Sequence, residues 1–323
     1  MTEKPFDDVD RLVDVHAHFL TPAYVEAAQA AGHQAPDGMP WWPGWEADEH
    51  LELMDKWGIE ASLLSVSSPG THFGDDAAAR RLTREVNDAG AELRRAHPGR
   101  FGHLASLPLP DVDGALTELV HALDELDCDG VIVETNVGGR YLGDAEFAPV
   151  WEELSRRRTP VLVHPTSPPH AETIALGRPR PMLEFPFETV RAVSDLVFTG
   201  AFQRYAGIQW IFTHGGGPLP LLADRIELFR SVLAPDGDPV TDQARNLWFD
   251  MAGTPFPNQV PAVEHAFGTE RLLYGSDYCW TPSFAVDAQL AAIDAADRPG
   301  EETWRALAAR NGTRLFPRVA RRS

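Results

Sequence analysis

Two histidines one residue apart, His16 and His18, end the apolar run LVDVHAH and could bind a metal ion. In a β-strand, residues i and i+2 point to the same face, so both imidazoles would project from one side. Their Cα atoms would lie roughly 6.6 Å apart, a spacing at which two imidazoles can converge on one ion with bonds of about 2.1 Å. Two surface imidazoles at a strand end would have the same signature, so the pair alone does not establish a metal site.

Three more side chains of suitable chemistry end other apolar runs. His164 ends PVLVH, His214 ends IQWIFTH, and Asp277 ends RLLYGSD. A lone strand-end histidine is more often a hydrogen-bonded structural residue, and a lone strand-end aspartate often caps the next helix. Five such groups at the same end of separate apolar strands favour a shared site instead. Imidazoles together with a carboxylate favour Zn²⁺, with Mn²⁺ or Fe²⁺ as alternatives.

The elements that must carry these side chains are short apolar runs that alternate with amphipathic helical patterns. The expected strands cover residues 11–18, 59–66, 100–109, 130–136, 160–165, 208–214, 246–252 and 271–277. Helices are expected between them, among others within residues 75–98 and 114–127. Near-continuous apolar strands in such an alternation indicate parallel strands that are buried on both faces.

Eight such units predict an α/β fold of the (β/α)8 TIM-barrel type, which we expect to form a single domain over residues 1–323. An open doubly wound sheet is the alternative, but HAHFLTPAY lacks the Gly-x-Gly-x-x-Gly fingerprint that follows the first strand of such a sheet. The carboxyl ends of all eight barrel strands meet at one face, where active sites lie. The five groups are therefore expected to form a catalytic site. A barrel with a purely structural metal ranks below this, because structural zinc is usually enclosed by cysteine-rich ligand sets.

Two loop insertions and the C-terminal tail fall outside this repeat. Residues 21–47, after the first strand, are rich in Pro, Gly and Trp, and residues 165–187, after the fifth, are rich in proline. Long aromatic loops at one end of a barrel suggest walls or a lid over a pocket. The tail 301–319 is expected to form one helix and then a short apolar helix that begins near Asn311 and packs on the barrel.

Composition and charge exclude several classes of function. The formal net charge of −20 argues against a nucleic-acid or anionic-membrane partner, since both need a basic patch. No segment approaches about 18 uninterrupted apolar residues, so we expect no membrane span. No secretory signal is visible, which makes the cytoplasm the default compartment. Cys128 and Cys279 form no Cys-x-x-Cys pattern, and lysine occurs only at Lys4 and Lys56, so arginine must supply almost every cation for an anionic substrate.

Four motifs in this order, DVHAHF, VLVHP, THGGGPLP and LLYGSDY, resemble the amidohydrolase superfamily, specifically the branch related to aminocarboxymuconate-semialdehyde decarboxylase. The resemblance covers nearly the whole chain. The longer strings SVSSPGTHFGDD, LPLPDVDGAL, YLGDAEFAPVWEEL and EFPFETVRAV are similar to the 6-methylsalicylate decarboxylase-like members. The metal-site motifs are shared by a broad family, whereas the longer strings mark a subfamily in which several substrates are expected.

The resemblance implies a ligand set and a division of roles. It makes His16, His18, His164 and Asp277 the metal ligands, with Zn²⁺ as the cofactor and Mn²⁺ as the alternative. His214 takes the position of the family's unliganded histidine, to which acid–base work is assigned. Asp277 and His214 are thus the candidate catalytic residues.

The resemblance also implies a homodimer. Arg225 stands eleven residues after His214, where the related decarboxylase has an arginine that reaches a substrate carboxylate from the neighbouring subunit. The alternative for Arg225 is an exposed helix residue within LLADRIELF. One departure concerns the aspartate motif, which is usually followed by Tyr-Pro-Phe, whereas here Tyr-Cys-Trp280 follows Asp277. An indole at that position would alter the aromatic wall of the pocket, which affects the identity of the substrate more than the class of reaction.

Two reactions fit this set of residues. The first is non-oxidative decarboxylation of a small aromatic carboxylate, a 2-hydroxybenzoate or 6-methylsalicylate type of acid. Its carboxylate and ortho phenolic oxygen would chelate the metal. Asp277 would protonate the ring carbon that bears the carboxylate, and His214 would keep the proton inventory of the site correct and orient the substrate or water. The alternative is hydrolysis of an ester, lactone or amide by metal-bound water, with His214 or Asp277 as the base. The fourth strand, GVIVETN, has no lysine for a carbamylated bridging ligand, which disfavours the binuclear hydrolases.

Aromatic side chains of the two insertions and of the loop after the eighth strand are candidates to stack on a substrate ring. Packing in the core or in a lid is the alternative role for each of them. His72, in GTHFGDD after the second strand, is a candidate contact for polar groups of the substrate. The aromatic candidates are Trp41, Trp42, Trp45, Phe185, Phe187 and Trp280.

Overall fold

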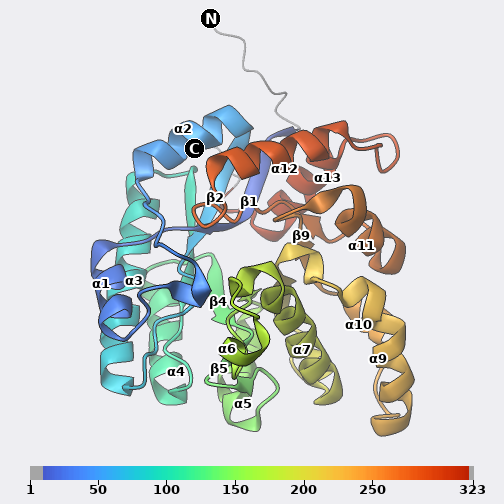
Figure 1. Cartoon of the computed structure of the whole chain (residues 1–323), viewed down its shortest axis with the longest axis horizontal. Helices are drawn as coiled ribbons and strands as arrows, with labels where there is room; N and C mark the ends of the chain where they lie inside the picture. Colours follow the sequence, from blue (N-terminus) through green and yellow to red (C-terminus); the bar gives the residue numbers. More distant parts are fainter. Residues whose placement is uncertain (1–9, 320–323) are drawn as a thin grey trace, which may run out of the picture.

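Eight parallel strands form a closed barrel in the computed structural model, which describes residues 10–319 (Figure 1). The strands, which pair in chain order, are β1 (Leu12–His18), β2 (Ile59–Ser65), β3 (Phe101–Ser106), β4 (Gly130–Glu134), β7 (Pro160–His164), β8 (Gln209–Phe212), β9 (Trp248–Asp250) and β10 (Leu272–Leu273). A parallel bridge between Asp14 and Tyr274 closes the ring from β10 back to β1, and the Val15 amide donates to the Tyr274 carbonyl at 3.0 Å. The predicted (β/α)8 barrel is confirmed, and the open sheet is excluded.

Helices surround the strands (Figure 1). They are α1 (Pro22–Ala30), α2 (Ala47–Trp57), α3 (Asp76–Ala96), α4 (Val112–Val120), α5 (Ala148–Arg157), α6 (Ala171–Ile174), α7 (Glu184–Phe198), α8 (Ala201–Arg204), α9 (Leu219–Leu233), α10 (Val240–Ala244), α11 (Val260–Phe267), α12 (Ser283–Ala295) and α13 (Trp304–Leu315). Helix α3 shows why the predicted helices form: Asp75 caps its N-terminus by accepting from the Ala78 amide, and Arg94 and Arg95 lie in its last turn, where cations are favoured. Among residues 10–319, no helix is both long enough and apolar enough to span a membrane.

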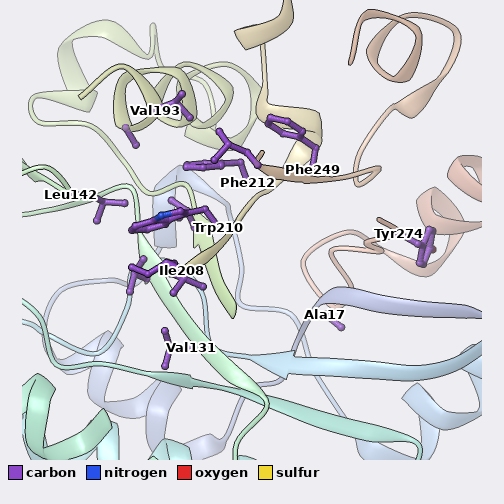
Figure 2. Close-up of a cluster of buried hydrophobic side chains, with 14 of the residues drawn as sticks. Ala17, Val131, Leu142, Val193, Ile208, Trp210, Phe212, Phe249 and Tyr274 are labelled. Carbon is purple, nitrogen blue, oxygen red and sulfur yellow. The ribbon is translucent and has the colours of Figure 1, made fainter. Parts of the chain in front are cut away.

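Two layers of apolar side chains hold the barrel together. The larger layer lies between the strands and the helices, and Figure 2 shows some of its members, among them Trp210 and Phe212 from β8 and Val193 from α7. The smaller layer fills the inside of the barrel and leaves the carboxyl ends of the strands to polar groups. Its members are Val13, Val15, Ala61, Leu63, Leu104, Ile132, Leu162, Ile211, Trp248, Leu273, Phe316 and Val319.

Several strands are shorter than their apolar runs predict. β8 ends at Phe212, two residues before His214, and β10 contains only Leu272 and Leu273, so Asp277 lies in the following loop. His214 and Asp277 both adopt left-handed backbone angles, with φ of 54° and 58°. The expected strands over 208–214 and 271–277 are therefore wrong in their extent, because the chain turns into the barrel mouth before the polar residue is reached.

The C-terminal tail forms one helix rather than two. α13 runs without a break through Asn311, whose side chain donates to the Thr269 and Leu272 carbonyls at 3.0 and 2.8 Å. Asn311 is thus a buried anchor, and the helix cap is Thr303 at the other end. The expected short helix beginning near Asn311 is wrong, whereas the expected packing on the barrel is confirmed by the place of Phe316 in the inner layer.

The two insertions meet above the strand ends. The first contains α1 and a tight turn at Pro36–Gly38, and the second contains α6, a turn at Arg180–Met182 and the start of α7. Asp37 joins the two, because it accepts hydrogen bonds from Ser167 at 2.5 Å and from Ser68, in the loop after β2, at 2.7 Å. A further hairpin, formed by β5 (Asn136–Val137) and β6 (Arg140–Tyr141), follows β4. The sequence did not predict this hairpin.

Candidate active site

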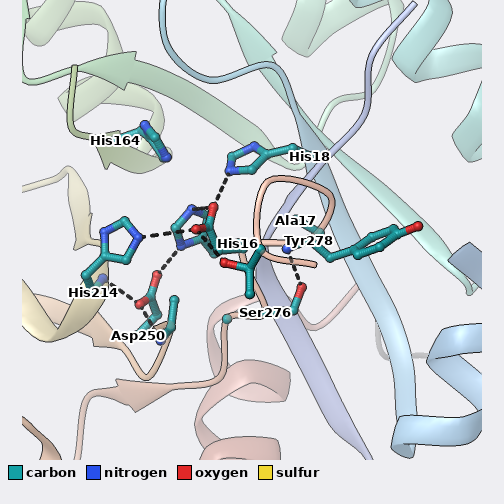
Figure 3. A network of polar contacts seen from close by, with 12 residues as sticks. His16, Ala17, His18, His164, His214, Asp250, Ser276 and Tyr278 are labelled. Carbon is teal, nitrogen blue, oxygen red and sulfur yellow. Dashed lines mark hydrogen bonds and ion pairs between the residues drawn. The ribbon is translucent and has the colours of Figure 1, made fainter. Parts of the chain in front are cut away.

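Four histidines and one aspartate converge at the mouth of the barrel. Figure 3 shows His16 and His18 of β1, His164 of β7 and His214 around a common space. One ligand atom from each of His16, His18, His164 and Asp277 lies within 4.8 Å of the others. Nε2 of His16 and Nε2 of His18 are 3.3 and 3.2 Å from Asp277 Oδ1. Two atoms bonded to one ion at about 2.1 Å lie about 3–4 Å apart, so this spacing suits a shared divalent cation.

A change of register in β1 brings both histidines to the mouth. Val13 and Val15 belong to the layer inside the barrel, and strict alternation would then turn His16 and His18 outward. The pairing of β1 with β2 shifts register between Asp14 and Ala17, which changes the residues that face inward. The same strand therefore supplies apolar filling below and two imidazoles above.

The outer ring nitrogens of His16 and His164 are already bound to hydrogen-bond acceptors. His16 Nδ1 lies 2.8 Å from Asp250 Oδ2, and His164 Nδ1 lies 2.7 Å from the Pro165 carbonyl oxygen. Because a carbonyl or carboxylate oxygen only accepts, each Nδ1 must carry the hydrogen. Nε2 of each ring is therefore the nitrogen that is turned to the site, where it can bind a metal ion in its unprotonated form.

His18 is held in the same way through a hydroxyl group. Its Nδ1 lies 3.1 Å from Ser65 Oγ, and the Ser65 hydroxyl donates to the Ala17 carbonyl at 3.2 Å. Ser65 therefore accepts from His18, whose Nε2 is also free of hydrogen. The buried Nε2 atoms of His16 and His18 make no hydrogen bond within the described chain. Unpaired buried polar atoms are costly, and a divalent cation would satisfy both, so the residues present fit a metal ion.

The charges in the cluster also prepare it for a cation. Burial alone would lower the pKa of His16, but the Asp250 and Asp277 carboxylates outweigh it and raise that pKa to about 10. Burial would raise the pKa of Asp277, but His16 above all holds it well below its usual range. Burial lowers the pKa of His18 and of His164, so both rings are neutral. A divalent cation would take over the place of the proton on His16.

His214 stands beside this set, on the other oxygen of Asp277. Its Nε2 is 3.6 Å from Asp277 Oδ2, which also accepts from the Thr281 hydroxyl at 3.0 Å. Its backbone amide donates to Asp250 Oδ1 at 2.7 Å. The two oxygens of Asp277 thus have separate surroundings: Oδ1 faces His16 and His18, and Oδ2 faces groups that can exchange a proton.

Asp250 is a part of the site that the sequence reasoning missed. It lies at the end of β9, and its two oxygens bind His16 Nδ1 on one side and the amides of His214 and Ala252 on the other. It is fully buried. Its signal was present in the sequence, since NLWFDMA places a single carboxylate inside an apolar strand, as RLLYGSD does for Asp277.

Replacing Asp250 with Asn is expected to weaken metal binding about 10- to 100-fold, with a similar loss of kcat/KM. The amide no longer balances the positive charge of His16, and its NH₂ group can turn towards Nδ1 and move the imidazole hydrogen to Nε2. Competition with a chromophoric chelator measures the affinity. Asp129→Asn is the matched control, because Asp129 is a buried carboxylate at the opposite end of the barrel that binds the His103 amide. Equal metal affinity in the two variants would contradict the role given to Asp250.

The cluster forms the floor of a cavity of about 660 Å³. His164, His214 and Asp277 line it, together with the hydroxyls of Ser67 and Ser68. Among the described residues that line it there is no lysine and no arginine. The apolar part of the wall includes Met39, Met182, Leu183, Phe185, Phe187, Leu221 and Trp280.

The structure brings two of the predicted substrate contacts, Phe187 and Trp280, to this cavity, and Phe185 with them. Trp42 lies behind Trp280, with ring centroids 5.5 Å apart, and supports the wall from the rear. The other indoles of the first insertion do not line the cavity: Trp41 is exposed, and Trp45 packs on Phe19.

His72 and Arg225 are not brought to the cavity of their own chain. His72 lines a neighbouring cavity and lies 2.8 Å from Asp76 at the start of α3, so the first turn of that helix holds its ring away from the metal cluster. Arg225 is exposed on α9, with its guanidinium 5.7 Å from the Phe229 ring.

Known proteins are similar to this chain in sequence and in fold. A family model described as Amidohydrolase matches residues 13–318. The 6-methylsalicylic acid decarboxylase acuB of Aspergillus aculeatus is 36% identical over 323 residues, which cover 96% of this chain and 97% of that protein. The crystal structure of an amidohydrolase II has a TM-score of 0.90 at 33% identity and covers 95% of this chain and 99% of that chain. The crystal structure of a 2,6-dihydroxybenzoate decarboxylase complexed with 2,6-dihydroxybenzoate has a TM-score of 0.82 at 25% identity, with 95% and 99% covered.

Proposed function

The chain belongs to the amidohydrolase family, and on this premise we propose that it is a metal-dependent, non-oxidative decarboxylase of hydroxylated aromatic acids such as 6-methylsalicylate. The observation that carries the proposal is the set of His16, His18, His164 and Asp277 at the floor of a cavity with aromatic walls. Relatives that act on such acids, the decarboxylase acuB and the 2,6-dihydroxybenzoate decarboxylase, support it.

Three imidazoles and one carboxylate suit Zn²⁺, which we propose as the ion, with Mn²⁺ as the alternative. A bound ion supplies a Lewis acid for the carboxylate and ortho phenolic oxygen of the substrate. The chain positions the ring. Phe185, Phe187 and Trp280 offer faces and edges on which it can stack, and they keep bulk water from the reacting carbon.

Asp277 delivers the proton on which the reaction depends. A proton passes from His214 Nε2 to Asp277 Oδ2, which it faces at 3.6 Å, and then to the ring carbon that bears the carboxylate. The bond between that carbon and the carboxylate breaks, its electron pair restores the aromatic ring, and CO₂ leaves. Solvent returns one proton to His214, so each turnover consumes one proton and one carboxylate and releases one arene and one CO₂.

Hydrolysis of an ester, lactone or amide uses the same residues, so the test must separate the two reactions. Incubation of the metal-loaded protein with 6-methylsalicylate in D₂O should release CO₂ and place deuterium at the former carboxyl carbon. Heavy oxygen from labelled water should not enter the product. Entry of heavy oxygen from water into the product of an ester or lactone, with no CO₂ from aromatic acids, would favour the hydrolase.

We also propose that the chain acts as a homodimer through one face of α9. Leu221, Arg225, Leu228 and Val232 recur at helical spacing along that face, and the three apolar side chains are each more than 60% exposed. An exposed apolar stripe of this kind is typical of a protein–protein interface. It begins at Leu221, which also lines the cavity, so Arg225 of one subunit would lie near the cavity mouth of the other.

Val232→Asp is expected to convert the dimer to a monomer at micromolar concentration, because a charge on each side of a symmetric interface meets its own copy. Size-exclusion chromatography with light scattering measures the mass. Leu176→Asp is the control, since Leu176 is 85% exposed but lies on the second insertion. Arg225→Ala should leave the dimer intact and raise KM about tenfold or more, as expected for a lost hydrogen bond to a charged group. A wild-type monomer, or an unchanged KM, would exclude the shared site.

A further inference from the structure

The turn that carries His214 has an unusual backbone. Four successive residues have positive φ angles: 54° at His214, 61° at Gly215, 74° at Gly216 and 58° at Gly217. Glycine adopts such angles freely, whereas a residue with a Cβ atom is disfavoured there. The surrounding structure must therefore hold His214 in this conformation, and the place of its imidazole depends on that support.

The ring of His214 is not fixed by a hydrogen bond to its outer nitrogen. Nδ1 is buried and makes no hydrogen bond within the described chain. The rings of His16 and His164 pack against it, with centroids 5.1 and 6.0 Å away, but they tether neither nitrogen. The distance of 3.6 Å from His214 Nε2 to Asp277 Oδ2 therefore depends on the backbone of the turn.

Gln259 binds the carbonyls of this turn. It ends the segment Pro255–Gln259, which follows β9. Its side-chain Nε2 donates to the Gly215 carbonyl at 3.1 Å and to the Gly217 carbonyl at 3.0 Å. A Cβ atom on Gly215 would lie 2.7 Å from Cγ of Gln259, so the side chain lies directly against the turn. Both hydrogens of the amide are used in this contact.

Asp250 supports the turn as well, but it cannot be tested separately. It accepts from the His214 amide at 2.7 Å (Figure 3). Its other oxygen binds His16 Nδ1, so a change at Asp250 also disturbs the metal cluster. The hydrogen bonds of the Gln259 side chain reach only the turn. Gln259 is therefore the support whose loss isolates the position of His214.

We propose that Gln259 is a positioning residue for proton transfer, because its amide holds the turn so that His214 Nε2 faces Asp277 Oδ2. The inference rests on the proposed function, in which His214 supplies the proton to Asp277. The place needs a neutral donor of two hydrogens, since a carboxylate only accepts and a hydrocarbon does neither. Without it, two carbonyls lose their partner and the turn can relax away from its positive φ angles.

Gln259→Glu keeps the shape of the side chain but removes the donors, and Gln259→Leu removes all polarity. Each should lower kcat for 6-methylsalicylate by about 10- to 100-fold, since a displacement of about 1 Å can cost about 100-fold. Metal content should stay at the wild-type value, and the Kd of the acid should change by less than about twofold, because only the proton-transfer step is affected. Elemental analysis, calorimetry and single-turnover CO₂ release measure the three quantities.

Gln243→Leu is the matched control. Gln243 is a buried glutamine of α10 that donates to the Asp238 carbonyl at 2.6 Å, outside the cavity wall. Its replacement should lower Tm about as much as Gln259→Leu does and leave kcat unchanged.

The double variant His214→Gln, Gln259→Leu shows whether Gln259 acts through His214. Its kcat should equal that of His214→Gln alone, because support of the turn has no effect on the rate once the imidazole is gone. A crystal structure of Gln259→Leu should show the His214 ring displaced from Asp277. This second readout does not depend on activity.

The proposal is rejected if the losses of the two single variants multiply in the double variant, since Gln259 would then act on the substrate or on the fold as a whole. A rise in Kd with an unchanged kcat rejects it too, because it would make Gln259 a substrate contact. Failure of the proposed function has a different signature, which is a wild-type protein that releases no CO₂ from aromatic acids. The crystal structure still tests the support of the turn in that case, and an unmoved His214 ring overturns it.

Discussion

His16→Ala should reduce kcat/KM for 6-methylsalicylate by about 10³-fold or more and should lower the metal content from about one ion per chain to a small fraction. His16 Nε2 faces the proposed ion position beside Asp277 Oδ1, and its Nδ1 is bound to Asp250. Metal-assisted polarisation is worth several kcal/mol, and each 1.36 kcal/mol corresponds to a factor of ten in rate. Elemental analysis of the purified protein and a CO₂ assay measure the two effects.

Removal of a fully buried side chain can also disturb folding, so a second ligand variant is needed. His164→Ala leaves the contact between His16 and Asp250 intact and should give the same loss of metal and activity. His97→Ala, at the C-terminal cap of α3, is the control and should behave as the wild type. Treatment of the wild-type protein with a chelator should abolish activity, and addition of Zn²⁺ or Mn²⁺ should restore it. Full activity of either His16→Ala or His164→Ala would show that the reaction does not depend on the metal.

The sequence was sufficient to predict the barrel and the membership of the metal cluster. The reason is that an apolar run ending in a histidine is a local pattern, and the topology of a parallel barrel brings all such ends to one face. His16, His18 and His164 lie at strand ends as expected. His214 and Asp277 reach the same space although they lie beyond their strands, because left-handed turns carry them back over the mouth.

Features that depend on register or on contacts distant in sequence could not be predicted in the same way. The shift in β1 that turns His16 inward depends on its pairing with β2 and on Asp14, which accepts from the His16 and Ser276 amides. The single helix α13 depends on Asn311 finding carbonyls of the loop before β10 and of β10 itself. A helical pattern alone does not reveal such partners.

Asp250 and His72 show what strand-end position leaves undecided about a side chain. The resemblance implies the metal ligands but not the residues that hold them in place, so Asp250 was not among the predicted site residues. A metal-binding imidazole needs an acceptor on its other nitrogen, and Asp250 is that acceptor for His16. His72 also follows a strand, but its ring lies 2.8 Å from Asp76 and lines a neighbouring cavity, so a contact of His72 with the substrate stays a prediction. Strand-end position identifies residues that can reach the mouth, and the hydrogen-bond partner decides which of them do.

Asp277→Asn should lower kcat by about 10³-fold or more while substrate binding changes by less than about tenfold. The amide matches the shape of the carboxylate and can still place an oxygen beside His16 and His18, but it cannot carry a proton from His214 to the ring carbon. General acid catalysis by a positioned group contributes about 10²–10⁴-fold, and the loss of one anionic ligand adds to this. Single-turnover CO₂ release gives the rate, and calorimetry with 6-methylsalicylate gives Kd.

Thr281→Val separates the proton-carrying role from simple support of the loop. Thr281 donates to Asp277 Oδ2 at 3.0 Å, so its loss disturbs the same oxygen without removing the acid, and kcat should fall by less than about tenfold. The kcat of His214→Gln should lie between those of Asp277→Asn and Thr281→Val. In this variant solvent still protonates Asp277, but more slowly than the imidazole does. The order of the three rates is therefore the discriminating result. If Asp277→Asn were as active as Thr281→Val, the proton would have to reach the ring from another group, and Asp277 would be a metal ligand alone.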